Sequence, residues 1–185
     1  ATADHRCHEA DVTDLGGALG LIDGSPDWVV GGPPCQGFST VGRRQSQDTR
    51  NQLFSAFLEV VKVVRPSGFL IENVTGLRDM SFEGLIREAF EEAGYATTFQ
   101  VVRAADVGVP QLRRRMIFVG RQDGSRFGQV PVTHEQSEWA TVWDAIGDLP
   151  PLKPGESASL YTAEPHCSLA KTLRDDAEVL TSHVA

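Results

Sequence analysis

Apolar residues in the first two-thirds of the chain follow two patterns, which predict strands and helices in alternation. Residues 27–30 and 68–71 are short apolar runs that end at turn-forming or polar residues, as buried strands do. Residues 51–65 instead carry apolar side chains at helical spacing, and Pro66 ends this pattern. Residues 82–93 form a second amphipathic pattern, which the following glycine closes.

Two further strand candidates, residues 97–102 and 115–119, complete the alternating order. Strands and helices in alternation are typical of parallel βαβ units with helices on both faces of a sheet. We therefore expect an α/β fold with a doubly wound, mostly parallel sheet. From about residue 123 the pattern gives way to short mixed segments with one helix candidate at 141–146. The sequence thus predicts one domain over 1–122 and a second, less regular region over 123–185.

Composition is that of an ordinary globular protein. Of 185 residues, 41% are hydrophobic and 23% are charged, and no apolar run approaches the roughly 18 residues of a membrane span. The three cysteines, Cys7, Cys35 and Cys167, lie far apart and include no Cys-x-x-Cys pair. This usage favours a reducing compartment over a disulfide framework, and it predicts no metal site.

Charge is unevenly distributed along the chain. The formal net charge is −8, yet residues 103–128 contain six arginines against two aspartates. A smaller basic cluster comprises Arg43, Arg44 and Arg50. Because phosphate binding requires local positive potential rather than a basic protein, the acidic total does not exclude nucleic acid. A solvated arginine face remains the alternative.

Reactive or polar residues follow the first two predicted strands. Residues 31–39 contain Cys35, and Glu72 directly follows the second apolar run. If the two strands are neighbours, both side chains lie at the same edge of the sheet, where α/β proteins place their chemistry. Cys35 is then either an exposed nucleophile or a buried structural cysteine, and Glu72 is either an arginine partner or a working acid.

A third candidate segment precedes the last predicted strand. Strand alternation would place Gln111, Arg113 and Arg115 on one side of it. A planar guanidinium suits a carboxylate, a phosphate or the edge of a base. Surface salt bridges are the alternative.

These three segments resemble motifs of the cytosine-C5 DNA methyltransferases, in the same order and at similar spacing. They are Pro34-Cys35-Gln36, Glu72-Asn73-Val74 and Gln111-x-Arg113-x-Arg115. The resemblance covers roughly residues 5–122. It implies a partial, Rossmann-like methyltransferase core over 1–122 and the start of a target-recognition region over 123–185.

The resemblance also implies a cofactor and a set of site residues. The cofactor is S-adenosylmethionine, and the residues left to bind it are Asp11, Val12, Pro33 and Leu53. The catalytic residues are Cys35, which attacks carbon 6 of a flipped-out cytosine, Glu72, which holds N3, and Arg113 and Arg115, which hold O2. The implied substrate contacts are Pro34, Gln36, Ser39, Arg43, Asn73, Val74 and Gln111.

The family's glycine-rich cofactor turn and its closing helix have no counterpart in this sequence. We therefore expect a fragment, or one part of a split enzyme, whose exposed sheet edge pairs with a complementary chain or a second copy. The implied substrate is double-stranded DNA, in a bacterial cytoplasm at the nucleoid and within a restriction-modification context, with no membrane. The alternatives are a non-catalytic or split nucleic-acid-binding subunit, an RNA cytosine-C5 methyltransferase, and an unrelated α/β thiol enzyme pairing Cys35 with a histidine.

Overall fold

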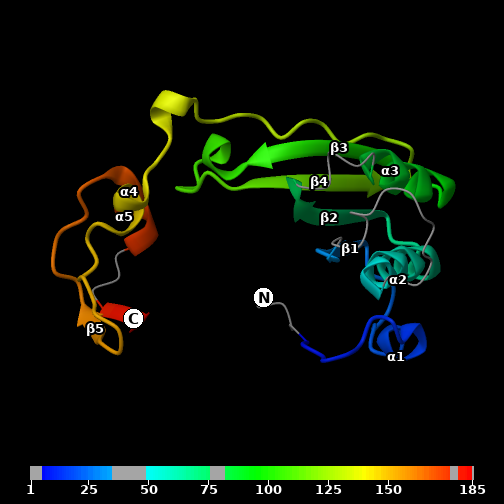
Figure 1. Ribbon diagram of the computed structural model, residues 1–185, viewed down its shortest axis with the longest axis horizontal. Coiled ribbons are helices and arrows are strands. Elements are labelled where there is room, and N and C mark those ends of the chain that lie inside the picture. Colours follow the sequence, from blue (N-terminus) through cyan, green and yellow to red (C-terminus); the bar gives the residue numbers. More distant parts are fainter. Residues whose placement is uncertain (1–5, 35–48, 76–81, 176–178, 185) are drawn as a thin grey trace. The chain divides into compact units, whose positions relative to one another are not determined.

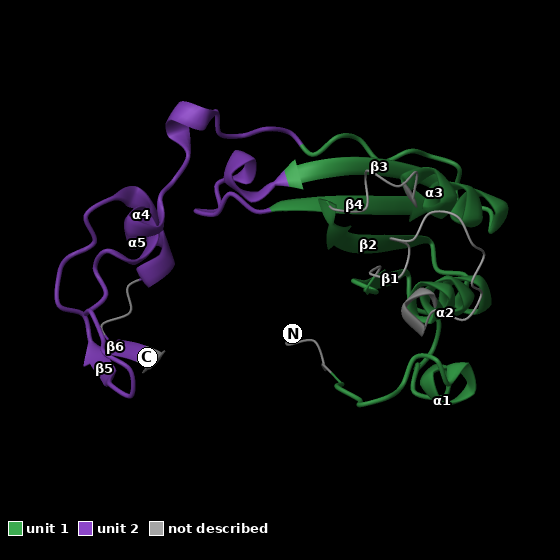
Figure 2. Ribbon diagram, in the orientation of Figure 1, with its two compact units in different colours: residues 1–102, 114–130 green, residues 103–113, 131–185 purple. Residues whose placement is uncertain are grey.

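The computed structural model describes residues 6–34, 49–75, 82–175 and 179–184. The chain forms two compact units (Figure 2). Unit 1 comprises residues 1–102 and 114–130, and unit 2 comprises residues 103–113 and 131–185. The units therefore interleave along the chain, and the functional division at residue 122 stays a prediction.

Unit 1 is built on a four-stranded sheet (Figure 1). Its strands are β1 (Trp28–Gly31), β2 (Gly68–Val74), β3 (Ala96–Arg103) and β4 (Arg114–Arg121), in the order β1-β2-β4-β3. β1 and β2 are parallel, and the long helix between them makes this the βαβ unit that the sequence predicts. The α/β class is therefore confirmed.

β4 lies between β2 and β3 and runs antiparallel to β2, so the described sheet is mixed. The connection from β3 to β4 contains only the short 3-10 helix Ala104–Val107 and a few further residues. A crossover to a parallel neighbour needs a dozen or more residues, so this connection returns the chain in the opposite direction.

Three helices accompany the sheet of unit 1: α1 (Leu15–Leu19), α2 (Thr49–Val64) and α3 (Phe82–Glu92). α2 ends just before Pro66, as predicted, because proline cannot continue the helical hydrogen bonds. Gly94 follows α3 with φ 91°, the left-handed conformation that suits a residue closing a helix.

The hydrophobic core lies between α2, α3 and one face of the sheet. The rings of Phe69 on β2 and Phe90 on α3 stack with centroids 3.9 Å apart. The Tyr95 hydroxyl is buried and donates a hydrogen bond of 2.9 Å to the carbonyl of Pro66. The other buried residues of this core are Phe54, Phe57, Val61, Ile71, Ile86, Met116 and Phe118.

Alternation along β2 separates the two faces of the sheet. Phe69, Ile71 and Asn73 are buried on the core face, whereas Glu72 and Val74 are more exposed on the other. The carboxylate of Glu72 and the amide of Asn73 therefore lie on opposite faces of the sheet.

Unit 2 consists of short elements. They are α4 (Val142–Ile146), α5 (Ser168–Arg174), the antiparallel pair β5 (Ser157–Leu160) and β6 (Val179–Val184), and the 3-10 helices Ala104–Val107 and Gln136–Glu138. Thr141 caps α4, where its hydroxyl accepts from the Asp144 backbone N–H at 3.1 Å. The predicted helix at 141–146 is thereby confirmed. None of the described helices combines the length and apolar character that crossing a bilayer requires.

Candidate active site

The carboxyl ends of β1 and β2 lie next to each other. Their parallel register pairs Gly31 with Ile71, so the residues that follow, Gly32 and Pro33, lie beside Glu72 and Asn73. A methyl group at Gly32 would lie 3.3 Å from Oε2 of Glu72, so this backbone approaches the carboxylate closely. The close approach of the Gly32 backbone to Glu72 was not predicted, although the two consecutive glycines at this strand end are a signal for it.

The described part of this loop ends at Pro34, which is exposed. Cys35, Gln36, Ser39 and Arg43 lie outside the described residues. The structure nevertheless brings the strand end that leads into Cys35 beside the strand end that carries Glu72.

Asn73 holds the two strand ends together. Its side-chain Nδ2 donates a buried hydrogen bond of 2.8 Å to the carbonyl of Pro33, two residues before Cys35. Its Oδ1 accepts from the backbone N–H of Val74, also at 2.8 Å. The amide therefore lies on the core face, away from Glu72, and the substrate contact expected of Asn73 stays a prediction.

Glu72 forms an ion pair with Arg115 of β4, between Oε1 and the guanidinium Nε. Antiparallel register explains the contact: Arg115 lies opposite Val74, so its side chain shares the face of Val74 and Glu72. The Arg115 side chain is 18% exposed and that of Glu72 is 44% exposed. Arg115 also donates from Nη1 to the carbonyl of Arg114 at 2.8 Å, which fixes the guanidinium beside the carboxylate.

Gln111 and Arg113 precede β4 and belong to unit 2, whereas Arg115 belongs to unit 1. The alternation that predicted one shared face therefore applies only from Arg114 onward. The chain first leaves the preceding 3-10 helix at Gly108, which has φ 85° and turns the backbone. Gln111 and Arg113 are both exposed.

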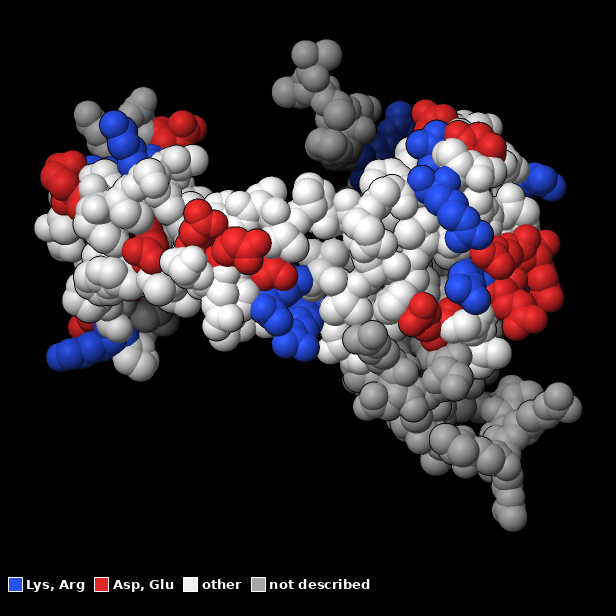
Figure 3. Space-filling view, turned by 90° about the horizontal axis from the view of Figure 1, so that it is seen from above, with Lys and Arg blue, Asp and Glu red and all other residues white. Residues whose placement is uncertain are grey.

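Most arginines of the segment 103–128 have carboxylate partners. Arg103 pairs with Asp106, Arg121 with Asp123 and Arg126 with Glu91, in addition to Arg115 with Glu72. Figure 3 shows basic and acidic side chains adjoining on the visible face. The local positive charge is thus largely compensated, which leaves Arg113 and Arg114 as arginines without an ion pair among the described residues.

The four residues expected to bind cofactor come from the segment 11–12, the end of β1 and helix α2. Asp11 closes a turn, because its Oδ1 accepts from the Thr13 hydroxyl at 2.7 Å and from the Thr13 backbone at 2.9 Å. These hydrogen bonds hold the pKa of Asp11 below its usual value. Pro33 is buried and Leu53 is half-buried.

Val12 lines a groove of about 420 Å³ beside α2. The other lining residues are Thr13, Leu15, Gln52, Ser55, Ala56 and Glu59.

In α/β proteins, ligands bind at the sheet edge where strand ends meet in this way. Similarity to known proteins identifies the family. A family model described as C-5 cytosine-specific DNA methylase matches residues 3–178. The chain belongs to this family. Membership sets aside the alternative of an unrelated thiol enzyme.

Known relatives agree with this assignment. The chain is 41% identical over 170 residues to the type II methyltransferase M1.HphI of Haemophilus parahaemolyticus, covering 87% of this chain and 45% of that protein. It is 34% identical to M.DdeI of Desulfomicrobium norvegicum, covering 95% and 45%. The chain thus spans about half the length of these curated relatives.

A solved structure also resembles this one. The crystal structure of a DNA modification methyltransferase encoded within an E. coli prophage superposes with a TM-score of 0.65 at 27% identity. The superposition covers 89% of this chain and 49% of that one.

Proposed function

We propose that this chain carries the catalytic centre of a DNA (cytosine-5-)-methyltransferase, with Cys35 as nucleophile. The hydrogen bond from Asn73 to the Pro33 carbonyl is the observation that carries the proposal. It fixes the backbone two residues ahead of Cys35 at the strand edge where the Glu72–Arg115 pair lies. A thiol on a loop anchored beside a carboxylate and a guanidinium is the arrangement that covalent catalysis on a cytosine ring needs.

The chemistry follows from these residue types. The Cys35 thiolate adds to carbon 6 of the cytosine, and N3 receives a proton that Glu72 shares or donates. Arg115 orients the Glu72 carboxylate and offers donors to O2 of the ring, with Arg113 as a second donor. Carbon 5 thereby becomes nucleophilic and can take up a methyl group. A base then removes the carbon 5 proton, the double bond between carbons 5 and 6 re-forms, and the thiolate leaves.

S-adenosylmethionine supplies the methyl group when bound. Val12 and Leu53 offer apolar contact to an aromatic ring. The Oδ2 atom of Asp11 can accept from an amino group, since both Thr13 bonds go to Oδ1. These residue types fit an adenine moiety. Pro33, at the end of β1, offers a further apolar contact.

The target base must leave the duplex, at a cost of a few kcal/mol. We assign Pro34, Gln36, Ser39, Arg43, Val74 and Gln111 to contacts with the flipped base and its strand. Asn73 is assigned to positioning rather than contact, because its amide bonds backbone groups on the core face. The names of the type II relatives support a role in a bacterial restriction-modification system. We further propose that the protein acts on nucleoid DNA in the cytoplasm.

Methyl transfer tests this function. The chain is incubated with radiolabelled S-adenosylmethionine and either duplex DNA or RNA, and the digested product is identified. The proposal predicts 5-methylcytosine in DNA. Methylation of RNA but not DNA would favour the RNA alternative, and a methyl group at any other base position would contradict the proposal.

A second feature favours complementation by another polypeptide. β1 is the outer strand of the described sheet, and Val30 on it is 67% exposed. An unpaired, apolar strand edge is a template for further strands. We infer that a complementary chain or a second copy pairs with β1. Light scattering after size-exclusion chromatography tests this, and a strictly monomeric chain with full activity would exclude it.

A further inference from the structure

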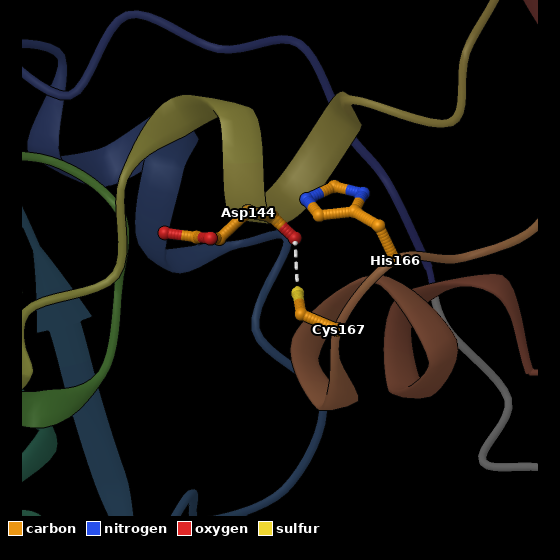
Figure 4. Close-up of side chains that lie close together, drawn as sticks. All are labelled: Asp144, His166 and Cys167. Carbon is orange, nitrogen blue, oxygen red and sulfur yellow. Dashed lines mark hydrogen bonds between the residues drawn. The ribbon is translucent and has the colours of Figure 1, made fainter.

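Three side chains of unit 2 with metal-binding atoms lie close together (Figure 4). They are Asp144 on α4 and His166 and Cys167 at the start of α5. Their ligand atoms all lie within 4.8 Å of one another. The sequence predicted no metal site, because its cysteines lie far apart and include no Cys-x-x-Cys pair.

Local hydrogen bonds fix two of these groups. Cys167 caps α5: its sulfur accepts from the backbone N–H of Ala170 at 3.5 Å and donates to the Asp144 carbonyl at 3.0 Å. The Asp144 carboxylate accepts from the Thr141 hydroxyl and backbone through Oδ2. These bonds, with a smaller effect of His166, keep the pKa of Asp144 below its usual value.

The third group, His166, is exposed and packs its ring 5.7 Å from that of Trp143. Asp144 and Cys167 also line a pocket of about 490 Å³, so solvent reaches the cluster. A water molecule can therefore reach the cluster as a fourth ligand of a bound metal ion.

The hydrophobic core of unit 2 is small. Of its described apolar residues, only Ala105 and Ala170 are fully buried, whereas Trp143, Ile146 and Leu173 are largely exposed. Small units with weak cores are commonly stabilised by a structural metal.

We propose that Asp144, His166 and Cys167 bind a divalent cation of the zinc type, which links α4 to α5. Thiolate, imidazole and carboxylate are the ligands that zinc prefers, and water would complete a tetrahedron. Zinc bond lengths imply ligand atoms roughly 3.3–3.6 Å apart, so side-chain rotation must close the widest gap by about 1 Å. On binding, the Cys167 thiol releases its proton to solvent, and the sulfur exchanges its bond to the Asp144 carbonyl for one to the metal.

The chain offers a matched control. Cys7 and His8 are also adjacent in sequence and exposed, but among the described residues they belong to no group of three metal-binding side chains. A cysteine next to a histidine is therefore not sufficient, and the third ligand distinguishes the two places.

Cobalt titration tests the proposal. The whole chain, carrying Cys35→Ser to remove the thiol outside the described residues, is reduced and titrated with Co²⁺. A sulfur-to-cobalt charge-transfer band is recorded in this protein and in versions with Cys167→Ser, His166→Gln or Cys7→Ser added. Serine is itself a good helix cap, so Cys167→Ser removes the thiolate while keeping the α5 cap.

We expect one equivalent of cobalt to produce the band, Cys167→Ser to abolish it and Cys7→Ser to leave it unchanged. His166→Gln, at an exposed position that folding does not need, should weaken cobalt affinity at least tenfold. No band in the parent protein, a band that survives Cys167→Ser, or unchanged affinity in His166→Gln would overturn the proposal.

Discussion

The two units of this chain are stabilised in different ways. Unit 1 packs stacked and edge-on aromatic rings between two helices and a sheet. Unit 2 is held by helix caps, a short strand pair and arginine–aromatic contacts, such as Arg174 over Tyr161 at 4.0 Å. The candidate catalytic edge belongs to unit 1, where β2 and β4 are anchored by a continuous core. Glu72, Asn73 and Arg115, which need a fixed geometry, therefore lie on the unit with the larger buried core.

The largest expected effect is on the core of unit 1. Phe90 is fully buried and contacts three other aromatic rings, so Phe90→Ala should lower the free energy of unfolding by about 3–5 kcal/mol. Leu173→Ala in unit 2 removes a side chain that is 60% exposed and should cost less than about 0.5 kcal/mol. Hydrogen exchange with mass spectrometry reads the two units separately. Equal losses of protection would refute the contrast between them.

The next prediction concerns Glu72. Glu72→Gln keeps the shape of the side chain but removes its charge and its ability to hold a proton for N3, so methyl transfer should fall by about 10²–10⁴-fold. Stability should change by no more than about 1 kcal/mol, because the ion pair with Arg115 is partly exposed. Glu91→Gln is the control, since Glu91 of α3 forms an exposed ion pair with Arg126. If both variants retain full transfer, the role assigned to Glu72 is wrong.

A smaller loss is expected at Asn73. Asn73→Ala removes the donor to the buried Pro33 carbonyl, which should lower the free energy of unfolding by about 1–3 kcal/mol. Because the loop leading to Cys35 loses its anchor, the rate of adduct formation should fall while Kd for DNA stays unchanged. Gln100→Ala is the matched control, because it also removes a buried side-chain amide that bonds a backbone group, the N–H of Val130 at 2.7 Å. A weakened Kd with an unchanged adduct rate would instead indicate a direct substrate contact.

The smallest effect is a pH dependence in the loop after β4. Hydrogen bonds from Ser125, with Arg121 as a further partner, lower the pKa of Asp123 to about 2. A lowered folded-state pKa stabilises the fold above the unfolded value of about 4 and loses this contribution as pH falls toward about 2. Ser125→Ala should raise the Asp123 pKa toward its usual value, which an NMR titration of the carboxyl carbon measures. An unchanged pKa would show that the Ser125 hydroxyl does not contribute, and that its backbone N–H and Arg121 are sufficient.

Sequence patterns predicted the elements of unit 1 well. The apolar runs at 27–30 and 68–71 correspond to β1 and β2, and the helical patterns correspond to α2 and α3. The direction of β4 could not be read from the order of elements, because that order does not distinguish a crossover from a short return between neighbouring strands. α5 and the β5–β6 pair were not predicted, since α5 is short and capped by cysteine rather than by a usual capping residue.

For the candidate site, sequence predicted that Cys35 and Glu72 share a sheet edge, and the strand ends indeed meet. Alternation alone could not show that Asn73 bonds Pro33, because the partner lies forty residues away. Nor could it show that Gln111 and Arg113 precede the strand that carries Arg115.

The most direct test of the central claim is a covalent trap. The chain is incubated with S-adenosylmethionine and duplex DNA containing 5-fluorocytosine, in which fluorine at carbon 5 blocks the final elimination, and the linked peptide is mapped by mass spectrometry. We predict an adduct at Cys35 that is lost in Cys35→Ser and formed more slowly in Asn73→Ala. An adduct at Cys7 or Cys167, or methyl transfer to DNA without any adduct at Cys35, would contradict the account.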